Sequence, residues 1–524
     1  SNSRRQPHRS GTPDGPWFAN MNAAVVIAQG FWAAGNLISA GRFAAALRRP
    51  EEVQAAWLRK RLAADAESAF GREHDFHRIR NHRDYARTVP LREWADFSPW
   101  IDRIRAGEHA VLSMDPVSHL APTSGSTGAR KLIPFTPVLH RAFAEAVGAW
   151  MADLARVEPG ILGGPAYWSI SPLEPDEDGA ASAVRVGFAE DADYLGGWRA
   201  KVAQLVMAVP ADLRHERDID AFWMRTAACL LARRDLRLIS VWHPSFLELI
   251  LRAAEQNWGE MLSSLPQHRA LELKRIGPND PASWWPGLRV ISCWGDLAAE
   301  PGLRELAVRF PQCRVQAKGL LATEAVVTIT WGGVYPLAVR SHFFEFISDH
   351  GEVMAAHELE TGKTYEVVVT NGGGLWRYRL GDLVECTGHC ARTPLLRFLG
   401  RAGNVSDLCG EKLSEPFVAG VMAAQWPRAE NRPRTAFLRP CHRPGDAGYD
   451  LVVDKPVEES CLASLEEGLR RNPHYDLARR LGQLRELRMR VEAEAGVLPL
   501  HSTNRRIGDI KPKVLESFGY TGRK

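Results

Sequence analysis

The most informative stretch of this sequence runs Thr123-Ser124-Gly125-Ser126-Thr127-Gly128-Ala129-Arg130-Lys131. Its glycines let the backbone approach an anion closely, and its hydroxyl and backbone N–H groups can donate hydrogen bonds to that anion. It is not a Walker loop, because it lacks the Gly-Lys-Ser/Thr ending after a four-residue spacer. Thr136 and Pro137 then supply a cap and a first residue for a helix. The stretch predicts a phosphate-binding loop before a helix; a polar surface loop is the alternative.

Further along the chain, four stretches carry candidate functional residues: Gly319 to Glu324, Gly374 to Asp382, Arg397 to Arg401 and Gly508 to Lys513. In the first, a carboxylate beside a threonine suits a magnesium–nucleotide site, because Mg²⁺ prefers oxygen ligands. In the second, a carboxylate held by a Gly turn could accept hydrogen bonds from both ribose hydroxyls. The alternatives are a surface Thr-Glu pair, a hairpin turn with structural arginines and a solvated basic tail.

The pattern of apolar residues around these stretches predicts an α/β fold. Residues 18 to about 90 show helical spacing, and between about 90 and 400 short β-rich runs alternate with helical ones. The predicted strands include Ala166 to Ile170, Leu236 to Val241, Leu288 to Cys293 and Tyr365 to Thr370.

After Arg401 the pattern changes to that of a compact α+β unit of roughly 120 residues. Strands are predicted at Ala436 to Leu438 and Tyr449 to Val453, and an amphipathic helix at Val457 to Arg471. Alternation of apolar and charged residues from Leu487 to Val491 predicts a half-buried strand.

Length and composition narrow the class of protein. A chain of 524 residues is too long for one ordinary core, so at least two domains are expected. The net charge of +4 is small for this length and argues against a nucleic-acid-binding protein. The eight cysteines show no tight framework, which favours reduced thiols and a cytoplasmic location. A zinc site at Cys386, His389, Cys390 and Cys409 is not expected, because these residues lack a second short-spaced pair of ligands.

One segment raises the question of a membrane. Phe18 to Gly41 carries no charge, and a membrane-spanning helix needs roughly twenty mostly apolar residues. Asparagine, glutamine and serine interrupt this run, and small residues dominate it. We therefore expect a buried or surface-docked helix here; a membrane contact and a signal peptide are the alternatives.

Taken in order, the five candidate stretches resemble those of the adenylate-forming superfamily of acyl-CoA synthetases, luciferases and peptide-synthetase adenylation domains. More closely, the chain resembles the auxin-responsive-promoter family of acyl-acid amido synthetases, in its bacterial branch. The resemblance extends from about residue 18 over nearly the whole chain. It is carried by Phe70 to Phe76, Val89 to Leu91, Pro99 to Ile101, Gly107, Pro122 to Pro134, Gly319 to Ala325, Phe343 to Phe346 and Tyr378 to Asp382.

The resemblance implies a domain organisation and a set of site residues. It implies a large nucleotide-binding domain over 18–402 and a small domain over 403–524. A disordered tail is expected over residues 1–17, because the first residues are polar and basic. The ATP-binding residues that the resemblance implies are Thr123, Ser124, Gly125, Ser126, Thr127, Gly128, Lys131, Ala322, Thr323, Glu324, Tyr378, Asp382 and Arg401. It implies Lys511 and Glu324 as catalytic residues, with Glu324 also binding magnesium.

The chain departs from the family pattern at two places. Leu320 and Leu321 stand where many relatives have Tyr-Gly or Tyr-Ala, so the acyl or adenine contact differs there. Gly403 replaces the hinge acid of acyl-CoA synthetases, which argues against a large domain rotation of the CoA-ligase kind.

The reaction implied is ATP- and Mg²⁺-dependent adenylation of a small carboxylic acid, followed by transfer to an amine, expected to be an amino acid. A ligase that forms a thioester with CoA or a carrier protein is one alternative, and an ATP-binding regulatory module without turnover is another. The sequence identifies neither the acid nor the amine. Trp242 and Trp294 could line an aromatic pocket, although most of the 17 tryptophans are expected in the core.

Overall fold

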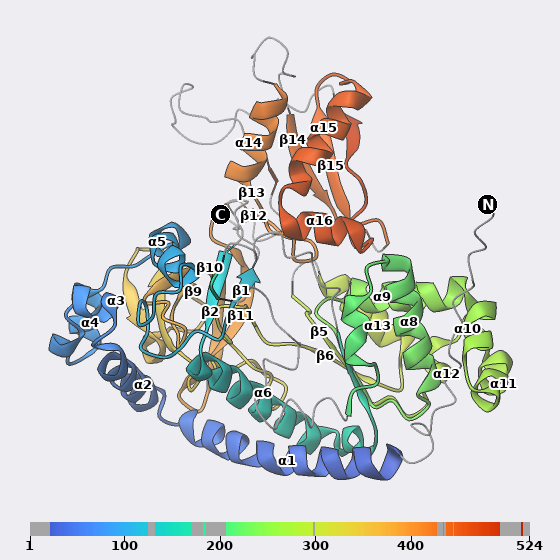
Figure 1. The fold of residues 1–524 in the computed structure, drawn as a ribbon, viewed down its shortest axis with the longest axis horizontal. Helices are drawn as coiled ribbons and strands as arrows, with labels where there is room; N and C mark the ends of the chain where they lie inside the picture. The colour runs from blue at the N-terminus through green and yellow to red at the C-terminus, as the bar shows by residue number, and fades with distance from the viewer. Residues whose placement is uncertain are drawn as a thin grey trace, which may run out of the picture.

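The computed structural model describes residues 21–123, 131–169, 182–184, 206–296, 299–403, 405–426, 433, 436–443, 445–492, 515 and 516. Within these ranges the chain forms a mixed α/β structure, which confirms the predicted fold class (Figure 1). Helices come first, two larger sheets follow, and a smaller α+β unit ends the chain.

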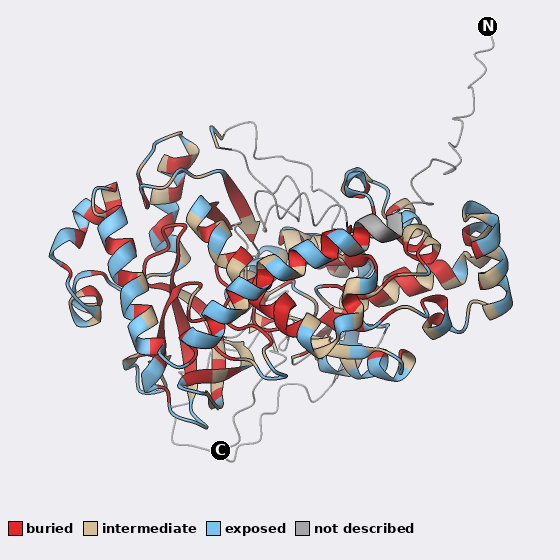
Figure 2. Ribbon diagram, turned by 90° about the horizontal axis from the view of Figure 1, so that it is seen from below, coloured by how far each residue is buried: buried red, intermediate tan, exposed pale blue. Residues whose placement is uncertain are grey.

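The predicted N-terminal helices are present. They are α1 (Met21–Ala46), α2 (Pro50–Asp65), α3 (Ala69–Glu73), η1 (Phe76–Arg78), α4 (His82–Thr88) and α5 (Trp94–Arg105). Helix α1 lies along α6 (Pro137–Val157), and buried and exposed residues alternate along it (Figures 1 and 2). The two helices pack closely, because a Cβ on Gly148 of α6 would lie 2.9 Å from Oδ1 of Asn36. Among the described residues, no helix combines the length and hydrophobicity needed to cross a lipid bilayer.

Helix α6 begins where its cap was predicted. Thr136 accepts a hydrogen bond from the backbone N–H of Leu139 at 3.2 Å, and Pro137 occupies the first turn. The Thr136 hydroxyl also donates to the carbonyl of Gly372 at 2.7 Å. This cap therefore begins the helix and also ties it to a distant loop.

Two larger sheets form the body of the molecule. The first is antiparallel, in the order β11-β10-β9-β7-β8, and the second is parallel, in the order β3-β4-β5-β6. The strands of the first are β7 (Phe343–Ser348), β8 (Val353–Ala355), β9 (Thr364–Thr370), β10 (Tyr378–Cys390) and β11 (Thr393–Arg401). Those of the second are β3 (Ala166–Trp168), β4 (Leu238–Ser240), β5 (Val290–Cys293) and β6 (Arg314–Ala317). The predicted strands are thus present, apart from Ile170, which lies outside the described residues.

Helices connect the parallel strands, as such crossovers require. The helical elements of this region are η2 (Pro159–Gly163), η5 (Ala211–His215), α8 (Ile219–Ala232), α9 (Pro244–Gln256), α10 (Trp258–Ser264), α11 (Gln267–Ile276), α12 (Pro281–Trp284) and α13 (Glu300–Arg309). A further 3₁₀ helix, η7 (Ala356–Glu358), follows β8. Strand β5 is fully buried, as expected for a parallel strand covered on both faces.

The C-terminal part has its own hydrophobic core, to which Leu413, Tyr449 and Leu465 contribute. Its elements are β12 (Val405–Ser406), β13 (Leu413–Ser414), α14 (Glu415–Gln425), β14 (Ala436–Cys441), β15 (Gly448–Val453), α15 (Glu459–Arg470), α16 (Pro473–Arg480) and β16 (Arg488–Val491). One prediction is wrong in part. Strand β16 exists, but Met489 and Val491 are 37% and 46% exposed, because β16 is the edge strand of the sheet β14-β15-β16 and does not lie over this core.

Candidate active site

The predicted phosphate-binding stretch joins two paired strands. In the hairpin of β1 (His119–Thr123) and β2 (Lys131–Phe135), Thr123 lies opposite Lys131. Both residues are buried. Ser124, Gly125, Ser126, Thr127 and Gly128 lie outside the described residues, as does Lys511.

Lys131 points into the protein. Its Nζ donates a hydrogen bond to the Tyr378 hydroxyl at 2.9 Å, and the side chain is buried. Burial lowers the pKa of Lys131 to about 8, and the nearby carboxylate of Glu324 partly offsets this effect. A buried ammonium beside a carboxylate and a hydroxyl is well suited to meet an anionic ligand.

A network of hydrogen bonds fixes the backbone just before Tyr378. Arg377 adopts a φ of 51°, which is rare for a residue with a side chain. Its guanidinium donates to the Glu345 carboxylate at 2.8 Å and to the carbonyls of Ala86 and Val89 at 2.8 and 2.7 Å. These contacts offset the unfavourable backbone conformation and hold Tyr378 against Lys131.

Asp382 and Arg401 face each other across the antiparallel pair β10–β11. Arg401 Nη2 lies 3.1 Å from Asp382 Oδ1, and both side chains are largely buried. Burial raises the pKa of Asp382, while Arg401 acts in the opposite direction. The alternative of a hairpin turn with structural arginines holds for the first part of this stretch, because residues 371–377 connect the antiparallel strands β9 and β10. Asp382 itself lies within β10, after a bulge at Gly381 whose φ is 79°.

Glu324 lies in a tight turn. The bridge between Leu321 and Val326 and the hydrogen bond from Ala322 N to Ala325 O at 2.8 Å close this turn. Ala322 and Thr323 are half-buried, whereas Glu324 is only 4% exposed, so it is not a surface acid. Asn371 Nδ2 donates to its backbone carbonyl at 2.8 Å and anchors the turn.

These residues belong to one electrostatic cluster. Glu324 acts on the pKa values of Lys131, Asp382 and Arg401, although the four residues come from separate segments of the chain. In Arg401, burial acts to lower the pKa, but Asp382 and Glu324 together raise it. We call Lys131, Glu324, Tyr378, Asp382 and Arg401 the nucleotide cluster.

The sequence analysis missed two charged residues near this cluster. Burial, followed by Arg401, lowers the pKa of Lys412, and Asp407, Glu324 and Asp382 counteract this. Lys412 has a φ of 47° and follows Glu411, whose buried carboxylate has a pKa raised by burial to about 7. The sequence gives no clear signal for them, because Asp407, Glu411 and Lys412 are the only charged residues among residues 402–414 and form no run.

The residues of the cluster fit a magnesium–nucleotide complex. Mg²⁺ in such sites is usually held by one or two carboxylates together with substrate phosphates. Glu324 supplies a buried carboxylate of this kind. In the described ranges, no group of three or more His, Cys, Asp or Glu side chains could form a metal site from protein ligands alone. The eight cysteines are free thiols.

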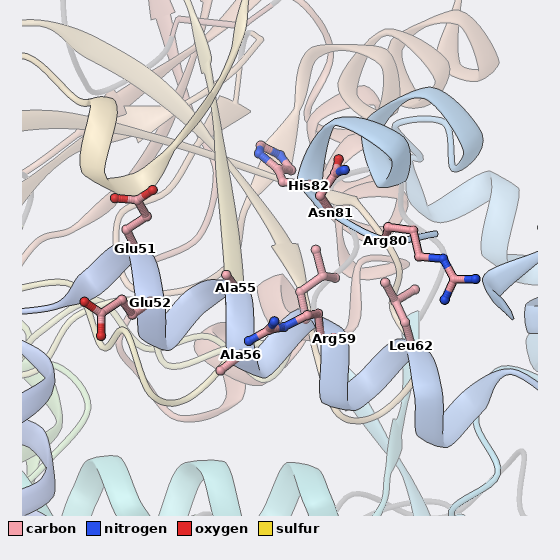
Figure 3. Close-up of a pocket in the computed structure, with 10 residues that line it drawn as sticks. Glu51, Glu52, Ala55, Ala56, Arg59, Leu62, Arg80, Asn81 and His82 are labelled. Carbon is pink, nitrogen blue, oxygen red and sulfur yellow. The ribbon is translucent and has the colours of Figure 1, made fainter. Parts of the chain in front are cut away.

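A separate pocket of about 650 Å³ lies between α2 and residues 80–82 (Figure 3). It is lined by Glu51, Glu52, Ala55, Ala56, Leu58, Arg59, Leu62, Arg80, Asn81 and His82. None of these residues belongs to the nucleotide cluster, but His82 Nε2 lies 2.8 Å from Oε1 of Glu345, whose other carboxylate oxygen binds Arg377. The Glu345 carboxylate therefore links His82, which lines the pocket, to Arg377, the residue before Tyr378.

Comparison with known structures identifies the fold. A structure of the GH3.15 acyl acid amido synthetase superposes with a TM-score of 0.61 at 17% identity, covering 85% of this chain and 87% of that one. A structure titled AtGH3.15 acyl acid amido synthetase in complex with 2,4-DB gives a TM-score of 0.64 at 17% identity, covering 88% and 89%. At this identity the likeness shows the fold alone: the chain has the fold of the acyl acid amido synthetases.

Sequence comparison identifies the family. The family model described as GH3 family N-terminal domain matches residues 39–279, and the one described as GH3 family central domain matches residues 335–401. The chain belongs to the GH3 family, which confirms the expected family, whereas its place in the bacterial branch stays a prediction.

Two relatives show the level of similarity. A probable indole-3-acetic acid-amido synthetase of Oryza sativa subsp. japonica is 22% identical over 439 residues, which cover 70% of this chain and 72% of the relative. A jasmonoyl–L-amino acid synthetase of Nicotiana attenuata is 24% identical over 371 residues, which cover 60% and 62%.

Proposed function

We propose that this protein activates a small carboxylic acid with Mg²⁺-ATP and transfers the acyl group to the amine of an amino acid. In the first step, a carboxylate oxygen of the acid attacks the α-phosphorus, and pyrophosphate leaves. In the second, the amine attacks the carbonyl carbon of the acyl-adenylate. The C–N bond of the amide forms, the bond to the phosphate oxygen breaks, AMP leaves, and the amine loses a proton to solvent.

The observation that carries this proposal is the nucleotide cluster. Five residues from four separate segments meet in a buried position, and cations and carboxylates are matched there. Electrostatic preorganisation of this kind stabilises charge that develops in a phosphoryl- or acyl-transfer transition state. The chain's relatives named above are synthetases that join an acid to an amino acid, which supports the same reaction here.

Each residue of the cluster has a proposed role. Asp382 Oδ1 is engaged by Arg401, so Oδ2 is the oxygen that would accept a hydrogen bond from the ribose. Lys131 would bind a phosphate together with Thr123 and residues 124–128, and Tyr378 would hold the lysine in position. Ala322 and Thr323 would contact the adenine and the α-phosphate.

Glu324 would hold Mg²⁺, and the bound ion would neutralise charge on the phosphates. The Glu324 carboxylate also acts independently of the ion. Its negative charge opposes the positive charges of Lys131 and Arg401, and Asn371 anchors the turn that holds Glu324 in place.

The proposed catalytic lysine is Lys511, in a small domain that we place from about residue 403 onward. A lysine suits this role because its ammonium is a compact charge on a long, flexible side chain. Lys511→Ala should suppress formation of the acyl-adenylate but spare amide formation from supplied acyl-adenylate. Lys513→Ala is the matched control and should affect the first step much less. Equal, mild effects of both substitutions would show that Lys511 belongs to a solvated tail.

The decisive experiment is a pyrophosphate-exchange screen over aromatic, aliphatic and hydroxy acids, followed by mass spectrometry of the products formed with mixed amino acids. We expect exchange that requires both Mg²⁺ and an acid, and an amide as the product. Binding of ATP without exchange for any acid would support a regulatory module instead. Formation of an acyl-CoA in preference to every amide would support a thioester ligase.

A further inference from the structure

The ends of three parallel strands meet beside the turn that carries Glu324. Lys318 directly follows β6, and its backbone N–H donates to the carbonyl of Cys293 at 2.8 Å. The N–H of Trp294 donates to the carbonyl of Trp242 at 2.9 Å, so the ends of β4, β5 and β6 remain adjacent beyond the sheet. In open α/β sheets, ligands bind at this carboxyl edge of the strands.

Two side chains at this edge form an unusual pair. Lys318 Nζ lies 5.0 Å from the centre of the Trp242 ring, within the range of a cation–π contact. Trp242 is nevertheless 50% exposed, although large aromatic side chains are usually covered. An exposed ring with an ammonium group over it is a surface suited to bind a ligand.

Lys318 has no matching carboxylate among the residues that the structure describes. Burial lowers its pKa to about 8, and the neighbouring group that counteracts this is the thiol of Cys293. Lys131, by contrast, is opposed by Glu324 and Asp382. A desolvated ammonium with an aromatic ring but no anion as its partner would be stabilised by an anionic ligand.

We propose that Lys318 and Trp242 form the acceptor subsite, in which the Lys318 ammonium binds the carboxylate of the incoming amino acid. This inference rests on the proposed function and extends it to an acceptor with a free carboxylate. The geometry suits this role, because Gly319, the next residue, begins the short stretch that leads into the turn with Glu324, where the acyl-adenylate would form. The carboxylate held at Lys318 would orient the amine while the cations of the nucleotide cluster remain engaged with AMP.

The test combines a substitution of Lys318 in the enzyme with replacement of the acceptor's carboxylate by a carboxamide. For wild-type enzyme, an amino acid should exceed its carboxamide by roughly 10- to 100-fold in kcat/KM, as expected for a hydrogen-bonded charge pair. Lys318→Met should abolish this preference by raising KM for the amino acid, and Lys318→Arg should restore part of it. Pyrophosphate exchange should not change in either variant. Lys274→Met, at an exposed lysine, is the matched control.

Three results would overturn the inference. One is an undiminished preference for the amino acid over its carboxamide in Lys318→Met. Another is an altered KM for the acid in pyrophosphate exchange, which would place the acid at Lys318. The third concerns binding without turnover: calorimetric titration of the AMP-bound enzyme with the amino acid should show binding for wild type and not for Lys318→Met, and equal binding would refute the subsite. Exchange without any amide product would instead contradict the proposed second step, and this titration would still decide the role of Lys318.

Discussion

The nucleotide cluster and the edge at Lys318 differ in how their charged side chains are paired. In the cluster, Asp382 pairs with Arg401, and Lys131 lies beside Tyr378 and near Glu324. At the edge, Lys318 contacts an exposed aromatic ring, and no carboxylate among the described residues pairs with it. Matched charges preorganise a site before its ligand arrives, whereas an unmatched charge depends on the ligand for its partner.

The largest effect is expected from breaking the pair in the nucleotide cluster. Asp382→Asn leaves the Arg401 guanidinium buried without its carboxylate, and removal of one partner of a buried pair typically costs about 3–5 kcal/mol. Urea unfolding should show this loss, and calorimetry should show weaker ATP binding. In the double variant Asp382→Asn/Arg401→Met, stability should largely recover while ATP binding does not. If Asp382→Asn is as stable as wild type, the side chains of Asp382 and Arg401 are solvated and neither depends on the other for stability.

The next largest effect is expected at Glu324. Glu324→Gln keeps the shape of the side chain but removes its charge, and loss of a charge-stabilising group at a reacting phosphate costs roughly 10²–10³ in rate. Pyrophosphate exchange should fall by this factor, while circular dichroism should show an intact fold. Near-wild-type exchange at saturating Mg²⁺ would remove Glu324 from the active site.

A smaller effect is expected from Tyr378→Phe, which removes the acceptor of the Lys131 hydrogen bond. The ammonium is charged below the pKa of Lys131, which is about 8, so affinity for ATP should decline as the pH rises through this value. Loss of the hydroxyl should lower the pKa further, weaken ATP binding by roughly tenfold and begin the decline at lower pH. Calorimetric titration with ATP across pH would measure this. Tyr365→Phe is the control, and an identical pH profile in all three proteins would contradict the role of Tyr378.

The smallest expected effect concerns Lys318 and has the opposite sign, because loss of this charge should not destabilise the protein. At about pH 7, Lys318→Met should leave the melting temperature unchanged or raise it by roughly 1–3 °C, since it removes a half-buried, unmatched charge. The lowered pKa of Lys318 means that the unfolded chain binds more protons than the folded one between about pH 8 and 10.5, so wild-type stability should rise with pH in this interval. The variant should lack this gain. A clear loss of stability would show that Lys318 has a structural partner.

Local features were predictable because they depend on neighbouring residues. Thr136 and Pro137 begin α6 as expected, and the apolar run of β9 forms its strand. The stretches that carry Lys131, Glu324, Asp382 and Arg401 could also be singled out, because glycines, hydroxyls and charges stand together in them, and the roles of these residues stay predictions. Lys412 and the pair of Lys318 with Trp242 were not found, because no local pattern marks a side chain whose partner lies many residues away.

The order of elements, the α/β class and the stretches in which a nucleotide site could lie follow from the amino-acid sequence alone. Helical periodicity, caps and apolar runs act over a few residues, so they can be read directly from the chain. Which charges are matched, in contrast, depends on how distant segments pack together. The register of β10 and β11 places Asp382 opposite Arg401, and the ends of β4 and β6 bring Trp242 under Lys318. The tertiary structure also decides that Met489 and Val491 are exposed, since burial depends on what packs over a strand and not on its own alternation.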